Sequence, residues 1–136
     1  MGKSRRASSR GFTLIEIMIV IFIVAILVSV AVPAYNQSIL RARESVLRQN
    51  LFTLRSVISQ YTLDKQKAPQ ALDDLVSAGY LKQIPADPMT TRNDTWTADQ
   101  DTDVIMSLDQ QGEGGIVDVH SGSSGVGSDG TAYNTW

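Results

Sequence analysis

A run of eighteen residues without a charged side chain, residues 17–34, most constrains what this chain can fold into. A helix that crosses a membrane needs about 20 mostly apolar residues, so the run favours a membrane-spanning helix. Residues 1–10 come before it and carry four basic side chains and no acidic one. A basic block followed by an apolar run is also typical of a targeting segment.

Charge is distributed unevenly along the 136 residues, although the net charge is only −2. Residues 36–67 hold six basic and two acidic side chains, whereas residues 68–136 hold two basic and eleven acidic ones. The acidic C-terminal part is unsuited to nucleic acid, because that binding depends on a positive field. The chain has no cysteine, which excludes a disulfide framework and a thiolate metal site. The length suffices for one domain of ordinary size.

Three interpretations of the N-terminal region compete. It is a secretory signal cut after Ala31 in the small-residue sequence Ser-Val-Ala, a simple membrane anchor, or a segment in which Glu16 has a role of its own. A carboxylate at membrane depth costs about 2.5–3.5 kcal/mol and usually has a partner and a function. The alternative is that Glu16 lies at the level of the lipid headgroups, where water solvates it.

Residues 9–16, Ser-Arg-Gly-Phe-Thr-Leu-Ile-Glu, resemble the processing site of the type IV pilin and type II secretion pseudopilin superfamily. The resemblance implies that a membrane peptidase removes residues 1–11 by cutting between Gly11 and Phe12, and that Phe12 is then N-methylated. Glu16 becomes the fifth mature residue, and Pro33 matches a proline common in the membrane segment of the family. Our hypothesis is that Glu16 sets the axial register of a filament by accepting the amine of Phe12 from a neighbouring copy.

The same resemblance implies a non-catalytic subunit that polymerises through its N-terminal helix, most like a major pseudopilin. Its implied partners are copies of itself, the prepilin peptidase, the inner-membrane secretion machinery, minor pseudopilins and, before assembly, membrane lipid. The implied location is the bacterial inner membrane, with the N-terminus cytoplasmic and the head periplasmic. A type IV pilus subunit is the alternative within the superfamily, and the lack of cysteine argues against it. A secreted or singly anchored binding domain is the alternative from another class.

Helical periodicity continues beyond the apolar run. One stripe contains Leu40, Leu47, Leu51, Leu54, Ile58 and Tyr61, with Phe52 and Val57 expected to widen it. We therefore expect one helix from about residue 12 to residue 66, with residues 12–35 in the membrane and residues 36–136 forming the head. Pro33 is expected to kink or locally unwind this helix.

The rest of the head is expected to form a small antiparallel sheet that the helical stripe covers, giving a pilin-like α+β fold. A short helix is expected over residues 70–78, with Gly79 after it in a capping position. Two β-prone runs, 104–108 and 116–120, predict a hairpin, and a third strand is expected near residues 95–98. Residues 72–88 resemble the segment that joins helix to sheet in major pseudopilins. Trp96 is expected to pack there, and Tyr133 and Trp136 are expected to dock onto the sheet.

The candidate chemistry is limited. Asp118, His120 and Ser121 have the residue types of a hydrolase triad, but no nucleophile elbow is present and Ser121 is expected on the opposite strand face, so we predict no enzyme activity. Residues 121–131 are rich in glycine and serine, which is typical of a flexible loop. A calcium loop is the alternative interpretation, because calcium accepts carboxylate, carbonyl and hydroxyl oxygens. Resemblance to the calcium region of major pseudopilins implies Asp129 as a ligand, with Asp118 and Ser121 as further candidates.

Overall fold

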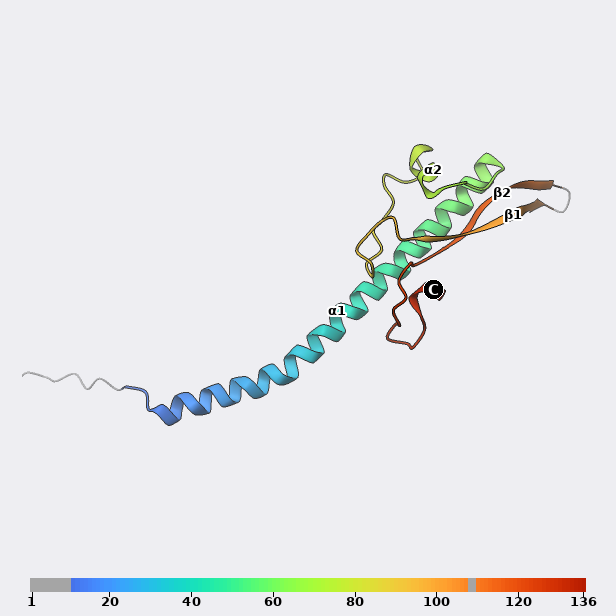
Figure 1. Cartoon of the computed structure of the whole chain (residues 1–136). Helices are drawn as coiled ribbons and strands as arrows, with labels where there is room; N and C mark the ends of the chain where they lie inside the picture. The colour runs from blue at the N-terminus through green and yellow to red at the C-terminus, as the bar shows by residue number, and fades with distance from the viewer. Residues whose placement is uncertain (1–10, 108–109) are drawn as a thin grey trace, which may run out of the picture. The chain divides into compact units, whose positions relative to one another are not determined.

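The structure is a computed structural model that describes residues 11–107 and 110–136, with side chains described outside residues 102–113. Its elements are α1 (Leu14–Lys65), α2 (Leu72–Ser77), β1 (Thr97–Ser107), β2 (Gln110–His120) and the 3-10 turn η1 (Tyr133–Thr135) (Figure 1). The chain divides into two units, Met1–Ser38 and Ile39–Trp136. The basic part of the predicted leader, residues 1–10, lies outside the described residues. The architecture is the predicted pilin-like α+β type.

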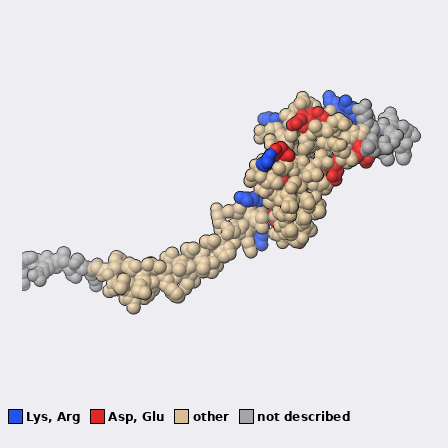
Figure 2. Space-filling view, viewed as in Figure 1, with Lys and Arg blue, Asp and Glu red and all other residues tan. Residues whose placement is uncertain are grey.

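The first unit contains the apolar half of α1. Within the described part of the chain, this is the one helix that is long and apolar enough to cross a membrane, and its apolar window buries nothing within the unit. In Figure 2 this stretch of α1 shows no charged side chain on the face in view. The helix continues through Pro33, so local unwinding is wrong, and the alternative of a kink stays a prediction. Proline removes one backbone hydrogen bond and crowds the carbonyl of the preceding turn, but its φ suits a helix, and in an apolar environment the remaining backbone groups have no partners outside the helix.

The second unit is built on the predicted stripe of α1. Its core consists of buried residues from α1, α2, β2, η1 and the loop before β1: Leu47, Leu51, Leu54, Ile58, Tyr61, Leu75, Trp96, Ile116, Val119 and Tyr133. Trp96 therefore packs as predicted, and its indole N–H donates to the carbonyl of Pro85 at 2.7 Å. The sheet is too small to bury its own face, and α1 supplies the missing apolar surface.

Two residues of the predicted stripe are exposed, so the prediction that they are buried is wrong. Phe52 is 69% exposed, because it follows Leu51 directly and so lies about 100° around the helix from the buried face. Leu40 is 38% exposed and lies before the first core residue of α1, Leu47. Glu44 has the helical position between Leu40 and Leu47, and its side chain is buried.

The sheet is a single antiparallel hairpin of β1 and β2, as predicted, but its strands are longer than the β-prone runs. The pairing of Thr97 with His120 makes the expected third strand the beginning of β1, so that expectation is wrong. Residues 110–115, which lie between the two β-prone runs, belong to β2, and residues 108 and 109 lie outside the described chain. Polar residues extend both strands through backbone pairing, which an apolar pattern does not reveal.

Short connections fasten the hairpin to the rest of the unit. The N–H of Ile116 in β2 donates to the carbonyl of Pro69 at 2.8 Å, just after α1 ends. The helix α2 is shorter than predicted, and Gly79 follows its C-cap with a φ of +83°, which glycine adopts without strain. Buried Asp87 accepts hydrogen bonds from the hydroxyl of Ser121 and, at 2.8 Å, from the N–H of Met89.

Candidate functional site

The predicted processing and assembly residues lie at the start of α1. Gly11 and Phe12 precede the helix, and Phe12 is 78% exposed. The helix begins at Leu14, and the N–H of Glu16 donates to the carbonyl and hydroxyl oxygens of Thr13 at 3.1 and 3.3 Å. Thr13 therefore caps the helix, and Glu16 lies in the first turn, where the helix dipole favours a carboxylate.

Exposed apolar side chains surround Glu16 along the helix. A groove of about 540 Å³ is lined by Leu14, Ile15, Met18, Ile19 and Phe22. Within the first unit these side chains pack against no other element of the described chain, and Glu16 is exposed among them. The surface is therefore apolar with one carboxylate near its end, which suits lipid or another apolar helix as a neighbour. The role of Pro33 in assembly stays a prediction.

A second candidate site lies where the C-terminal segment, residues 121–136, packs on α1. Glu44 is only 4% exposed, and its carboxylate accepts three hydrogen bonds from this segment. They come from the N–H of Ser128 at 2.7 Å, the hydroxyl of Ser128, and the hydroxyl of Tyr133 at 2.9 Å. The hydroxyl of Ser128 is the main cause that lowers the pKa of Glu44 below its ordinary value. Glu44 is thus a buried anion that holds the segment.

Sequence reasoning missed Glu44, although a signal was present. The apolar stripe steps by seven residues from Leu40 to Leu47, and the helical position between them on the same face is held by Glu44 in place of an apolar residue. A polar residue inside an apolar stripe is buried only when it finds hydrogen-bond partners. Those partners are supplied by residues 84 and 89 positions further along the chain.

Acid should weaken this contact. Because the folded pKa of Glu44 lies below the ordinary 4.5, its stabilising effect is present above that pH and is lost as the pH falls through the folded pKa. At neutral pH, Glu44→Gln should cost about 1–3 kcal/mol, since the amide cannot accept all three bonds. Urea unfolding across a pH series should show that the difference in free energy of unfolding between the native protein and Glu44→Gln becomes smaller in acid. Parallel curves for the two proteins would contradict the assignment, and Asp73→Asn, at an exposed carboxylate on α2, is the matched control.

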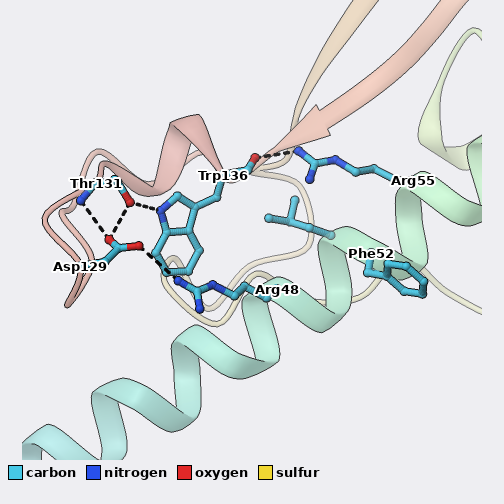
Figure 3. A pocket seen from close by; sticks show the side chains of 7 residues that line it. Arg48, Phe52, Arg55, Asp129, Thr131 and Trp136 are labelled. Carbon is cyan, nitrogen blue, oxygen red and sulfur yellow. Dashed lines mark hydrogen bonds and ion pairs between the residues drawn. The ribbon is translucent and has the colours of Figure 1, made fainter.

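Two arginines of α1 line a pocket of about 390 Å³ beside the C-terminal segment (Figure 3). The guanidinium of Arg48 pairs with the carboxylate of Asp129 at 3.2 Å and lies 4.2 Å from the ring centroid of Trp136. The guanidinium of Arg55 pairs with Asp118 at 2.6 Å and donates to the main-chain oxygen of Trp136 at 2.7 Å. Docking of Tyr133 onto the sheet is confirmed, because η1 contacts β2, and its hydroxyl also bonds Glu44 of α1. Trp136 contacts His120 of β2 through its main-chain oxygen, while its ring lies against Arg48 of α1.

The structure does not bring the three candidate calcium ligands together around one point. Asp129 accepts from Thr131 and Arg48, Asp118 accepts from Arg55, and the hydroxyl of Ser121 donates to Asp87. Among the described residues, no group of three acidic or histidine side chains is placed to hold a metal. A calcium ion needs six to eight oxygen ligands, and these carboxylates are already paired with donors. The arrangement does not fit calcium, and calcium binding itself stays an untested prediction.

The residues of the rejected triad are also directed elsewhere. One ring nitrogen of His120, Nδ1, contacts the main-chain oxygen of Trp136 at 2.6 Å, and the other, Nε2, contacts Asp99 at 3.1 Å. Ser121 is fully buried and bonded to Asp87, so its hydroxyl does not meet His120. Asp118 and Asp99 are paired across the two strands, and the guanidinium of Arg55 beside Asp118 offsets the repulsion between their charges.

Comparison with known proteins connects the N-terminal site to a family. Residues 6–32 match the family model of the prokaryotic N-terminal methylation motif, a range that includes Gly11, Phe12 and Glu16. The type II secretion system core protein G of Klebsiella michiganensis is 32% identical over 139 residues, covering 90% of this chain and 89% of that protein. The chain belongs to the family of type II secretion system core protein G.

Further relatives agree with this family. The core protein G of Klebsiella pneumoniae is 31% identical, covering 93% of this chain and 94% of that protein. The type IV major fimbrial protein FimA of Dichelobacter nodosus is 29% identical, covering 82% of this chain but 62% of that protein. No solved structure matches the chain. The family resemblance that the sequence motif predicted is confirmed, and the two Klebsiella proteins match more of the chain than FimA does.

Proposed function

We propose that this core protein G family member is the structural subunit of a type II secretion pseudopilus. The observation that carries the proposal is the likeness to core protein G along 90% of the chain, together with the methylation motif over residues 6–32. In this proposal the chain is a precursor, cut between Gly11 and Phe12 and methylated at Phe12. Mature copies then associate through the apolar half of α1, whose side chains have no partner within the first unit.

The proposal includes a location and partners. Residues 12–35 cross the bacterial inner membrane once, the N-terminus is cytoplasmic, and the head is periplasmic. The partners are other copies of the chain, the prepilin peptidase, the inner-membrane secretion machinery and minor pseudopilins. Lipid surrounds α1 before assembly, because its apolar side chains need an apolar environment. Neither catalysis nor binding of nucleic acid is part of the proposed role.

A type IV pilus subunit is the second candidate, and the likeness to a fimbrial protein favours it. The absence of cysteine from the sequence argues against it, since pilins often close a C-terminal loop with a disulfide. Deleting the chain's gene in its host and measuring export of secreted enzymes alongside surface pili separates the two. Loss of export with normal pili supports the pseudopilus.

The N-terminus of the mature protein tests the proposal directly. Edman sequencing and mass spectrometry should find N-methylated Phe12 as the first residue. Gly11→Ala should leave essentially all of the chain uncut. A Cβ at Gly11 meets no atom within 4 Å, so the substitution leaves the fold unchanged and its effect is on cleavage. Cleavage after Ala31 would indicate a secretory signal, and an intact native leader would indicate a simple anchor. Either result would overturn the proposal.

A further inference from the structure

We infer that Arg48 and Arg55 hold the C-terminal segment on α1 in the role expected of calcium, so that the head of this protein needs no calcium to fold. The two arginines are seven residues apart, which is two helical turns, and so they project from one face of α1. Each of them takes one of the two carboxylates that sequence reasoning assigned to calcium. The positive charge that these carboxylates need is therefore part of the chain.

Arg48 closes a ring of contacts with the end of the segment. Its guanidinium pairs with one carboxylate oxygen of Asp129, and the other oxygen accepts from the N–H and hydroxyl of Thr131 at 3.0 and 2.6 Å. The indole N–H of Trp136 donates to the hydroxyl of Thr131, and the indole ring lies against Arg48. Figure 3 shows this ring of side chains. These contacts occupy both oxygens of Asp129 with donors of the chain itself.

Arg55 fixes the same segment at a second point and ties it to the end of β2. Its Nη2 donates to the main-chain oxygen of Trp136 in the segment at 2.7 Å, while its Nε donates to Asp118 at 2.6 Å and its Nη2 to the main-chain oxygen of Val119 at 3.0 Å, both in β2. Trp136 is thus held through its ring by Arg48 and through its backbone by Arg55. A guanidinium has five N–H donors in a planar fork, which suits this combination of carboxylate and carbonyl oxygens.

The two arginines should not contribute equally. The side chains of Arg48 and Asp129 are 61% and 44% exposed, and ion pairs in such positions stabilise little. The side chains of Arg55 and Asp118 are less exposed, at 37% and 40%, and Arg55 makes further bonds to the backbone. Removal of Arg55 should therefore release the segment more than removal of Arg48.

The test measures thermal unfolding and hydrogen exchange of the full chain purified in detergent. In millimolar calcium chloride and in excess EDTA, the native protein should have the same melting temperature. Arg55→Met should lower that temperature by about 4–8 °C, and Arg48→Met by roughly half as much. In both variants, exchange should quicken in residues 121–136 and stay slow in α1 from Leu47 to Tyr61. Arg43→Met, at an exposed arginine of the same helix, is the matched control.

Clear outcomes would overturn the inference. A melting temperature that rises by several degrees with calcium, or falls with EDTA, would show that the ion stabilises the fold. Unchanged exchange in residues 121–136 of Arg55→Met would show that the arginine does not hold the segment. If an arginine variant fails to fold, the calcium and EDTA measurement on the native protein still decides. None of these readouts depends on secretion, so failure of the proposed function is a separate result.

Discussion

Glu16→Ala should abolish assembly of the protein into filaments and, with it, secretion. The carboxylate lies in the first turn of α1 among exposed apolar side chains and has no ionic partner within the described part of its unit. Holding it at membrane depth costs about 2.5–3.5 kcal/mol, a penalty that a neighbouring copy removes if Phe12 supplies its amine. Electron microscopy of filaments sheared from overproducing cells, with an export assay, measures the result.

Two controls make the Glu16 experiment specific. Ser29→Ala removes a polar side chain from the same apolar stretch, where its hydroxyl donates to the carbonyl of Ile26 at 2.7 Å. This variant should assemble normally, since its hydrogen bond is made within one helix. Immunoblots should show that the Glu16→Ala chain is present in the membrane at normal amounts and is cut after Gly11. Normal filaments from Glu16→Ala would remove the hypothesis that Glu16 sets the axial register.

Gly122→Ala should severely destabilise the head. A Cβ at this position would lie 2.0 Å from the carbonyl oxygen of Thr95, closer than any two such atoms approach without movement of the backbone. Gly122 follows Ser121, which is buried and bonded to Asp87, so this part of the chain cannot move aside freely. Overpacking of this kind costs about 1–3 kcal/mol and more where backbone must shift, so we expect at least about 3 kcal/mol.

Denaturant unfolding of the full chain in detergent, followed by tryptophan fluorescence, measures this loss. Ser124→Ala is the matched control, because Ser124 is exposed two residues further along the same segment. It should change the free energy of unfolding by less than about 0.5 kcal/mol. A Gly122→Ala protein as stable as the native one would mean that Thr95 and Gly122 are not packed as described.

Local sequence patterns predicted the elements because helices and hairpins follow short-range rules. The stripe from Leu47 to Tyr61 repeats with helical spacing, and the structure buries that face. Gly79 marked the end of α2 for a similarly local reason, since glycine adopts a positive φ readily. The prediction that Phe52 widens the buried stripe was wrong, because an apolar residue next to the stripe is buried only if another element covers its side of the helix. Which side is covered depends on the packing of the whole unit.

The sequence alone determined the apolar helix, the processing motif, the α+β class and the family, since each depends on residues close together in the chain. Only the tertiary structure decided which polar groups meet. Arg55 pairs with Asp118 at a separation of 63 residues, Arg48 with Asp129 at 81, and Glu44 with Ser128 at 84. Charged residues of one type look alike in sequence, and burial beside a particular partner gives each of these its role. For that reason the sequence shows Asp118 and Asp129 only as acidic residues, and the structure pairs each of them with an arginine of α1.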